Sequence, residues 1–485
     1  MIDGLKPYPA MKDSGVPWLG QVPEHWQVSP AFAVYRPRQV KNTGLVESTV
    51  LSLSYGRIIV KAPEKLRGLV PESFETYQIV EPGNIIVRTT DLQNDQTSLR
   101  VGHAHHRGII TAAYMCLETK PIVLNEFGYQ YLNAYDLLKI IYGLGSGLRQ
   151  NLDFSDIKRM PVLVPPPDEQ AAIVRFLDHA DRRIRRYIRA KQKLIKLLEE
   201  QKQAIIHRAV TRGLDPNVRL KPSGVEWLGD VPEHWEVRRV LSCLEGTRAG
   251  IWGDDPTPAN EADHVTCLRV ADFDMSRLSI HGSKLTKRAV PASLRNPRLL
   301  AAGDILMEKS GGGETEPVGR VVLYDENVAP HAICSNFIVR LRPNATTEPK
   351  FLLHVLAIMQ VTRRNVPCIK QTTGIQNLDE RAYLSLAIGV PPLVEQQAII
   401  ASLTNRLRPI DKAASRARRE IDLLREYRTR LIADVVTGKL DVREAAARLP
   451  DEAEELEPVD EIEAEGDTDE ACADDTDEVP EEIEA

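Results

Sequence analysis

The strongest constraint on this chain is a repeated tryptophan motif. Fifteen residues, SGVPWLGQVPEHWQV from Ser14, return as SGVEWLGDVPEHWEV from Ser223, with 12 identities at a constant offset of 209. Four of the five tryptophans lie in these two copies. A repeat of this length predicts a chain built by duplication of a unit of roughly 210 to 225 residues. The fold must therefore accommodate two similar halves.

A second repeat follows later in each half, at a different offset of 226. The segment VPPPDEQAAI from Val164 matches VPPLVEQQAI from Val390. The tetrapeptide QNLD also occurs twice, from Gln150 and from Gln376. Between the tryptophan motif and these segments the halves diverge, and the second half is longer there by 17 residues. Each half is therefore predicted to hold a constant motif, a variable domain and a constant C-terminal element.

The second repeat opens a long helical pattern in each half. Residues 169–212 and 395–437 contain no Gly, and Pro409 is their single Pro. Each pattern follows a proline cluster, and proline is favoured in the first turn of a helix. At 1.5 Å per residue, the two helices are expected to be roughly 63 to 66 Å long.

Both helical patterns carry an apolar stripe at alternating steps of four and three residues, which is typical of a coiled-coil seam. In the second helix the stripe consists of Leu403, Leu407, Ile410, Ala414, Ala417, Ile421, Leu424, Leu431 and Val435, interrupted by Arg428. In the first helix it consists of Leu177, Ala180, Ile184, Ile188, Ile195, Leu198, Ile205 and Ala209, with Lys191 and Lys202 at seam positions. We expect the stripes to bury each other in an antiparallel pair, and Pro409 to kink the second helix.

The variable segments have a mixed pattern, so the predicted fold class is α+β. Short runs that favour strands are separated by turns with Gly and Pro, and they are 49–54, 84–88, 304–307, 318–324 and 337–341. Residues 350–359 have a helical pattern. The expected architecture is two mixed α/β domains separated by two long antiparallel coiled-coil helices, with an internal pseudo-two-fold repeat.

The repeats also set the predicted domain boundaries. These are 1–28 for the N-terminal segment with the first motif, 29–163 for the first variable domain, 164–213 for the first helix, 214–237 for a linker with the second motif, 238–389 for the second variable domain, 390–441 for the second helix and 442–485 for an acidic disordered tail.

The formal net charge of −7 conceals two regions of opposite charge. Residues 451–485 hold 19 Asp or Glu and no Lys or Arg, whereas residues 1–450 hold 62 Lys or Arg against 50 Asp or Glu. A body with a net charge of +12 favours polyanionic partners, because Lys and Arg that neutralise phosphates release counterions. An ordinary solvated surface is the alternative. The acidic segment has too little apolar content to offset the entropy of folding.

Missing signals disfavour several classes of protein. No GxxxxGK[ST], HExxH, GxSxG, GxGxxG or (N/D)PP(Y/F) motif occurs, so no catalytic apparatus is expected in this chain. No apolar run reaches the roughly 18 residues of a membrane span, and no signal-peptide pattern opens the sequence, which points to the cytoplasm. Six cysteines without a CxxC pair are expected to be reduced packing thiols.

Two groups of residues have a structural and a functional interpretation. His103, His105 and His106 resemble a metal site, but no Cys or carboxylate stands at ligand spacing, so surface histidines are favoured and no metal is expected. The tryptophans of the repeated motif are expected to be large apolar anchors rather than ligand contacts.

Several Gly-containing turns carry residues suited to nucleic acid. Arg and Lys pair with guanine, Gln and Asn pair with adenine, and hydroxyls or backbone amides at glycine turns hold phosphates. The same composition is also ordinary in turns, and the occurrence of such turns in both halves favours the functional interpretation. The candidate DNA-contacting residues are Arg88, Thr89, Thr90, Arg149, Gln150 and Asn151 in the first half, and Lys309, Ser310, Arg320, Lys370, Gln371, Thr372 and Gln376 in the second.

The repeated GVxWLGxVPEHWxV motif, the VPPxxEQxAI helix start and the alternation of variable domain and helix closely resemble the specificity subunit of type I restriction-modification systems. The resemblance covers residues 12 to about 441. It implies that each variable domain is a target recognition domain for one half of a bipartite DNA site, and that the helices fix the gap between the half-sites. The acidic segment beyond residue 450 lies outside the family pattern.

The resemblance also implies partners. Such a subunit has no catalysis of its own, binds double-stranded DNA and two methyltransferase subunits, and through them recruits restriction and translocase subunits. S-adenosylmethionine, ATP and Mg²⁺ are then expected on the partner subunits, and no cofactor is expected in this chain. Because the two variable domains differ in sequence and length, the bipartite target is expected to be asymmetric.

Two other classes of function remain as alternatives. A pure protein scaffold would gather enzymes through its coiled coil without touching DNA, and the basic body and paired turns argue against it. An autonomous nuclease is disfavoured by the missing catalytic motifs. Binding of random-sequence duplex across a salt series separates a DNA-reading protein from a scaffold.

Overall fold

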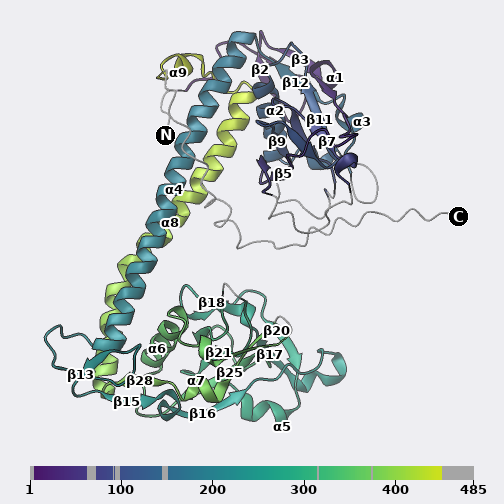
Figure 1. Cartoon of the computed structure of the whole chain (residues 1–485). Helices are drawn as coiled ribbons and strands as arrows, with labels where there is room; N and C mark the ends of the chain where they lie inside the picture. Colours follow the sequence, from purple (N-terminus) through teal and green to yellow (C-terminus); the bar gives the residue numbers. More distant parts are fainter. Residues whose placement is uncertain are drawn as a thin grey trace. The chain divides into compact units, whose positions relative to one another are not determined.

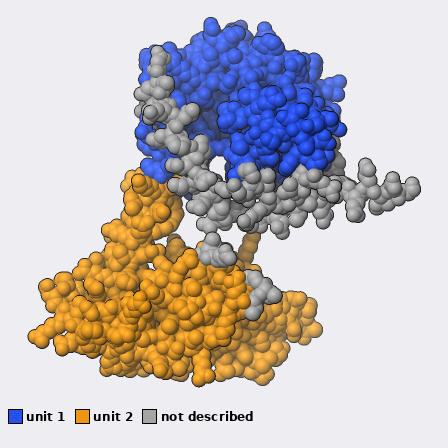
Figure 2. All heavy atoms as spheres, viewed as in Figure 1, with its two compact units in different colours: residues 1–190, 420–485 blue, residues 191–419 orange. Residues whose placement is uncertain are grey.

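The chain forms two compact units in a computed structural model that describes residues 5–62, 73–90, 92, 99–144, 151–313, 316–372 and 375–450 (Figure 1). Unit 1 comprises residues 1–190 and 420–485, and unit 2 comprises residues 191–419 (Figure 2). Two long helices, α4 (Pro167–Arg212) and α8 (Leu393–Val436), contribute residues to both units. Among the described residues, every helix is too short or too polar to span a membrane.

An antiparallel four-stranded sheet lies at the centre of unit 1. Its strand order is β4-β11-β8-β9, formed by β4 (Tyr35–Pro37), β11 (Tyr114–Thr119), β8 (Ile85–Arg88) and β9 (Val101–His103). The apolar run Ile85-Ile86-Val87 is buried on both faces of the sheet, which explains why a short segment forms an interior strand. The remaining strands of unit 1 are β1 (Met11–Asp13), β2 (Gln21–Pro23), β3 (Gln27–Pro30), β5 (Leu51–Ser54), β6 (Arg57–Val60), β7 (Gln78–Val80), β10 (Gly108–Ile110) and β12 (Pro161–Val164).

Unit 2 repeats this sheet with equivalent strands in the same order. The order is β16-β25-β21-β23, formed by β16 (Leu244–Ala249), β25 (Ile338–Pro343), β21 (Ile305–Glu308) and β23 (Val321–Leu323). The remaining strands are β13 (Leu220–Pro222), β14 (Asp230–Pro232), β15 (Glu236–Arg239), β17 (His264–Leu268), β18 (Phe273–Asp274), β19 (Ser279–Ile280), β20 (Thr286–Ala289), β22 (Ser310–Gly311), β24 (Ala332–Cys334), β26 (Ile369–Thr372), β27 (Ile375–Leu378) and β28 (Ala387–Val390). The α+β class and the internal repeat are confirmed.

Some of the shorter helices have a counterpart in the other unit. In unit 1 the shorter helices are α1 (Ala31–Val34), α2 (Asn125–Leu137), α3 (Phe154–Ile157) and α9 (Arg443–Ala447), and in unit 2 they are α5 (Ala292–Arg295), α6 (Pro349–Val361) and α7 (Glu380–Leu384). Helix α2 follows β11, the last strand of its sheet in chain order, as α6 follows β25 in unit 2, and the predicted helix 350–359 lies within α6.

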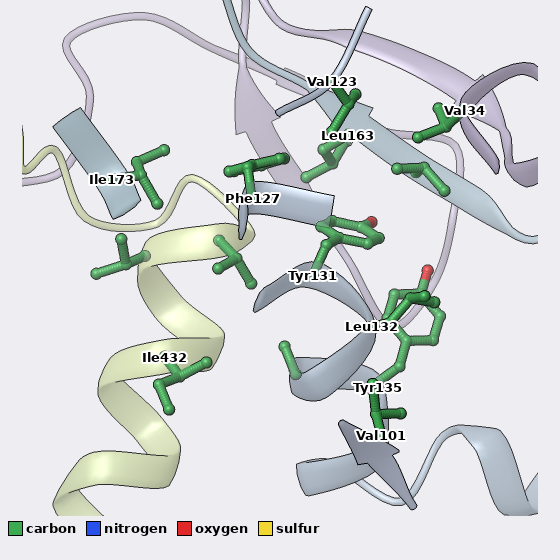
Figure 3. Packing of buried hydrophobic residues seen from close by; sticks show 14 of the residues in the cluster. Val34, Val101, Val123, Phe127, Tyr131, Leu132, Tyr135, Leu163, Ile173 and Ile432 are labelled. Carbon is green, nitrogen blue, oxygen red and sulfur yellow. The ribbon is translucent and has the colours of Figure 1, made fainter. Parts of the chain in front are cut away.

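Helix α2 joins the sheet of unit 1 to the long helices. Phe127, Tyr131 and Leu132 of α2 belong to one core with Ile173 of α4 and Ile432 of α8 (Figure 3). In unit 2, α6 has the same role, because its apolar side chains share a core with α4 and α8. Each variable domain is therefore fixed to the helical pair by a buried helix of its own.

The long helices pack together in each unit. In unit 1, Ile173 and Leu177 near the start of α4 share a core with Leu431 and Val435 near the end of α8. In unit 2 the opposite ends meet, and Ile206 and Val210 of α4 share a core with residues 399–410 of α8. The helices therefore pair antiparallel within each unit.

Polar seam positions of the long helices are paired. Arg428, which interrupts the apolar stripe, donates from Nε to Asp181 of α4. Lys202 Nζ lies 2.7 Å from Asp411 Oδ1 of α8. These pairs fill positions that apolar side chains occupy elsewhere in the seam, so charge complementarity helps to set the alignment of the two helices.

Two expectations concern α8 and the segment after it. Helix α8 continues through Pro409, so the proline does not end the helix, and the expected kink stays a prediction. Pro409 and Asn405 are both exposed, so water can satisfy the carbonyl that loses its intrahelical donor. The tail was predicted to be disordered from residue 442, but Val442 and Ala446 are buried in the core of unit 1, and α9 lies there. Residues 451–485 lie outside the described residues.

Candidate nucleic-acid interface

The two sequence repeats meet at the start of each long helix. In unit 1, Trp26 Nε1 donates to Glu169 Oε2 at 2.9 Å, and His25 Nε2 lies 2.6 Å from Glu169 Oε1. In unit 2, Trp235 Nε1 donates to Glu395 Oε1 at 3.1 Å, and His234 Nε2 lies 2.7 Å from Oε2. Both tryptophans are fully buried. We call the contacts of Glu169, together with the next residue Gln170, the first joint. The contacts of Glu395, together with Gln396, form the second joint.

The glutamine of each joint forms a hydrogen bond at the start of α2 or α6, the helix that packs the variable domain against the long helices. Gln170 Oε1 accepts from the backbone N–H of Leu124 at 2.8 Å, at the start of α2. Gln396 Oε1 accepts from the backbone N–H of Glu348 at 2.8 Å, at the start of α6. In both cases the amide nitrogen donates to two backbone carbonyls. The motif EQ therefore fixes one variable domain and one tryptophan motif to each long helix.

The first joint has more partners than the second. Tyr8 Oη donates to Glu169 Oε2 at 3.1 Å, and Arg443 Nη1 donates to Oε1 at 3.3 Å. Burial is the largest cause that raises the pKa of Tyr8 well above its usual value, and the Glu169 charge adds to it. The Glu169 side chain is 8% exposed and that of Glu395 is 28% exposed. Segments before β1 and after α8 thus close the first joint.

The candidate DNA-contacting turns follow equivalent strands of the two sheets. The backbone N–H of Leu152 donates to the Thr89 carbonyl at 2.9 Å, and that of Leu378 donates to the Lys309 carbonyl at 2.8 Å. Thr89 and Lys309 are therefore equivalent residues, directly after β8 and β21. Asn151 to Asp153 in unit 1 and Gln376 to Asp379 in unit 2 lie beside this turn, so the structure brings together segments that are distant in sequence.

In unit 1 the candidates have different environments. Arg88 ends β8 and is half-buried, and Thr89 is buried and donates its hydroxyl to the Ala113 carbonyl at 2.8 Å. The Thr90 carbonyl accepts from Arg100 at 2.6 Å. Asn151 is exposed beside the turn, and Arg149 and Gln150 lie outside the described residues. Thr89 therefore has a structural hydrogen bond, and Asn151 is the accessible polar side chain of this group.

In unit 2, three candidates lie at or beside the turn after β21, and the first, Lys309, has its Nζ 3.7 Å from Glu380 Oε1. Ser310 donates to Asn377 Oδ1 at 2.5 Å across the β22-β27 pair. Arg320 donates from Nε and Nη2 to the two oxygens of Glu308 at 2.8 and 2.9 Å, and from Nη1 to Glu316 at 3.3 Å. Both edges of the Arg320 guanidinium are therefore engaged within the protein.

The other candidates of unit 2 lie on the hairpin β26-β27. Gln371 is exposed, whereas Gln376 is buried and bonded to the backbone of Val318 and Gly313. Lys370 Nζ lies 2.7 Å from Asp379, whose hydrogen bond raises the pKa of Lys370. The backbone of Thr372 ends β26, and its side chain lies outside the description.

A cavity that sequence reasoning missed lies beside these residues in unit 2. It has a volume of about 530 Å³ and is lined by Trp252, Arg269, Glu308, Ser310, Arg320 and Phe337, among others. Trp252 and Phe337 are 36% and 46% exposed. One signal was present in the sequence, because Trp252 is the tryptophan that belongs to neither copy of the motif. We call this the Arg269 cavity.

The three histidines of unit 1 have different environments, because His105 and His106 are exposed, as expected, whereas His103 is buried and not on the surface. His103 is 8% exposed and stacks on Tyr129 with ring centroids 5.3 Å apart. Burial lowers the pKa of His103 to about 4, and His105 adds to this. Within the described residues, no group of three or more His, Cys, Asp or Glu side chains is placed to hold a metal ion.

The described cysteines are buried free thiols, namely Cys116, Cys243, Cys267, Cys334 and Cys368. Burial raises the pKa of Cys116 and of Cys267 to about 12. These thiols are therefore protonated near neutral pH and have the packing role that the sequence predicts. Cys472 lies outside the described residues.

Comparison with known proteins extends this picture. A family model described as the type I restriction modification DNA specificity domain matches residues 77–197 and 294–416, which is about half of the chain. The chain is 21% identical over 344 residues to the specificity subunit of the type I restriction enzyme MjaVIII of Methanocaldococcus jannaschii, which covers 70% of this chain and 75% of that protein. It is 22% identical to the putative MjaX specificity subunit of the same organism, over 61% of this chain and 63% of that protein.

A solved structure has the same fold. It comes from a study of complex assembly and conformational transition of the type I restriction-modification system, and it is 15% identical with a TM-score of 0.61. The match covers 86% of this chain and 99% of the solved chain.

Proposed function

Because this chain belongs to the family of type I restriction-modification DNA specificity subunits, we propose that each of its two target recognition domains reads one half of an asymmetric, bipartite site in double-stranded DNA. Specificity subunits of these systems are non-catalytic. The first domain corresponds to residues 29–163 and the second to residues 238–389.

The observation that carries this proposal is the contrast between equivalent positions. The joints repeat the same residues in both units. The turns after β8 and β21 do not, because Thr89 in unit 1 corresponds to Lys309 in unit 2. The residue before β11 is Ala113, and the residue before the equivalent strand β25 is Phe337. Two such surfaces present different side chains to DNA, so two different half-sites are expected.

The proposal includes a spacing role for α4 and α8. Both helices are continuous, with 46 and 44 residues, and they are paired by apolar and charged contacts in each unit. A continuous helix transmits length rigidly at 1.5 Å per residue. We propose that this pair of helices fixes the gap between the half-sites, and that the number of residues in each helix determines the length of the gap.

The partners in this proposal are those of the family. Two similar units offer two equivalent docking surfaces for two methyltransferase subunits, which in turn recruit the restriction and translocase subunits. S-adenosylmethionine, ATP and Mg²⁺ are then bound by the partners. The basic body of +12 in residues 1–450 supports the attraction to DNA.

Long-read methylome sequencing of cells that express this chain with its methyltransferase subunits tests the proposal. The expected result is one methylated motif with two different halves and a fixed gap. Replacing residues 29–163 with another such domain is expected to change one half only. A change in both halves, or no bipartite motif in the unmodified complex, would contradict the proposal.

A second experiment tests the spacing role and the alternative of a scaffold. Removing four residues from each long helix is expected to change the gap and leave both half-sites intact. Binding of a random-sequence duplex by the full chain with its methyltransferase is expected to weaken steeply as salt rises. Absence of binding at low salt would favour a protein scaffold.

A further inference from the structure

The Arg269 cavity combines features that suit a base edge. Its walls include two partly exposed aromatic rings, Trp252 and Phe337, beside the Gly-rich strand β22. The indole of Trp252 is held by Arg288, whose guanidinium lies 4.5 Å from the ring centroid. Arg288 Nη2 also donates to the Gly253 carbonyl at 2.9 Å, so the tryptophan loop is fixed. The Trp252 wall of the cavity is therefore held by contacts with a second side chain.

Arg269 is held in place by a buried carboxylate. Its Nη2 donates to Asp272 Oδ1 at 3.0 Å, and its Nε lies 3.4 Å from Oδ2. The backbone N–H of Arg269 donates to the same Oδ2 at 2.7 Å. The Asp272 side chain is 0% exposed, whereas that of Arg269 is 40% exposed. A solvent-accessible guanidinium is thus fixed by a group that solvent does not reach.

The geometry of this pair leaves one edge of Arg269 for a ligand. The carboxylate occupies the Nε edge, and the edge formed by Nη1 and Nη2 carries the remaining N–H groups. Two parallel N–H groups on that edge match O6 and N7 of guanine, which is the commonest specific contact in the major groove. Holding the fork in advance reduces the entropy lost on binding.

We propose that Arg269 reads a guanine of the half-site bound by unit 2, with Asp272 as its positioning residue and with Trp252 and Phe337 as apolar walls of the contact. This inference deepens the proposed function and rests on it. It replaces Arg320 as the guanine reader of this region, because Glu308 and Glu316 engage both edges of Arg320.

The main competing role for Arg269 is a contact to a backbone phosphate. A phosphate contact depends on charge and carries no sequence information, whereas a bidentate base contact depends on the planar fork. Substitution by lysine separates the two, because lysine keeps the charge and loses the fork.

The experiment uses the full chain with its methyltransferase subunits and a duplex library randomised across the second half-site. The unmodified complex defines the preferred bases, and Arg269→Lys, Arg269→Ala and Asp272→Asn are compared with it across a salt series. Arg277→Ala is the matched control, because Arg277 is 80% exposed and does not line the cavity.

Under the proposal, Arg269→Lys and Asp272→Asn lose the preference for guanine at one position of the second half-site by about 5- to 100-fold. The base preference at the first half-site stays as in the unmodified complex. The salt dependence of DNA binding by Arg269→Lys also stays the same. Arg277→Ala retains the guanine preference. Circular dichroism of Asp272→Asn checks its fold, and Arg269→Lys tests the proposal even if that fold is lost.

Two results would overturn the inference. One is an unchanged motif in Arg269→Lys with a uniform loss of affinity in Arg269→Ala and a salt slope lower by about 1, which identifies a phosphate contact. The other is a second half-site without guanine in the unmodified complex. In both cases a bipartite motif would leave the proposed function intact, whereas a complex without any bipartite motif would contradict the proposed function itself.

Discussion

The two units agree at their joints and differ at the turns beside their central sheets. At the joints, Glu169 corresponds to Glu395 and Gln170 to Gln396, with the same types of partner. Beside the turns after β8 and β21 the equivalent residues Ala113 and Phe337 differ, and both are exposed. Buried polar groups must all be satisfied together, whereas exposed side chains at a turn change independently. The difference locates stability in the joints and sequence preference in the turns.

The largest expected effect is at the first joint. Glu169→Ala leaves Trp26 Nε1 and the Tyr8 hydroxyl without their acceptor in a buried site, and it removes one of the two carboxylate partners of Arg443. It is expected to lower the free energy of unfolding by about 3 to 5 kcal/mol. Glu395→Ala, at a joint with fewer partners, is expected to cost about 1 to 3 kcal/mol. Urea titration followed by tryptophan fluorescence and by hydrogen exchange of the α4 amides measures both.

Asp168→Ala is the control for these variants, because Asp168 is an exposed acidic residue in the same helical turn. Its loss is expected to cost less than about 1 kcal/mol. Equal costs for Glu169→Ala and Glu395→Ala would show that the additional partners of the first joint contribute nothing to stability.

The glutamines are expected to give matched effects. Gln170→Ala and Gln396→Ala each remove three hydrogen bonds to backbone groups, two of them near the start of α2 or α6 and one to the proline carbonyl just before α4 or α8. Each is expected to cost about 2 to 3 kcal/mol. Hydrogen exchange in the first turns of α2 and α6 reports the loss locally. A large difference between the two variants would break the equivalence of the units.

Acidification is expected to affect the region of His103 in unit 1. Because burial lowers the pKa of His103 to about 4, the unfolded chain binds a proton there more readily. Stability from this group is complete above its ordinary pKa near 6.5 and is lost as the pH falls toward 4. The loss between pH 7 and pH 5 is at most about 2 kcal/mol. His103→Phe is expected to reduce this loss in pH-dependent urea titrations, and an unchanged pH slope would contradict it.

The smallest expected effect on stability comes from exchanging the residues before β11 and β25. Ala113→Phe and Phe337→Ala both alter exposed positions, so each is expected to change stability by less than about 0.5 kcal/mol. Each is expected to alter only the half-site of its own unit in the methylated motif. An effect of Phe337→Ala on the other half-site would show that the units do not read DNA separately.

The two long helices and the internal repeat could be predicted, because the sequence patterns that indicate them are local or repeated. Helices expected at 169–212 and 395–437 occur at 167–212 and 393–436, since an apolar period sustained over some forty residues is not ambiguous. The hydrogen bond from Trp26 to Glu169 joins residues 143 positions apart, and no periodic pattern in the sequence predicts it. The duplication could have revealed it, because both ends of the contact recur in both halves.

The interface could be predicted only in part. Thr89 and Lys309 directly follow strands, but the candidates of 370–372 and 376, expected in a turn, lie within β26 and β27. Thr89 and Gln376 are also buried and bonded to the backbone. Turn composition does not distinguish side chains that hold a turn together from those that face a ligand. Arg269 was missed because its significance depends on the buried carboxylate of Asp272 and on rings from two other loops.

The glutamine contacts of the joints have a consequence for how such chains diversify. Gln170 and Gln396 bind only main-chain N–H and carbonyl groups of the variable domains. Apart from the missing N–H of proline, main-chain groups are the same for every amino acid, so these contacts do not depend on the side chains of the variable domain. A newly acquired domain needs only a helix that begins at the right place to be seated correctly. Selection can therefore change the DNA sequence that such a chain recognises without changing the residues that hold its domains to the long helices.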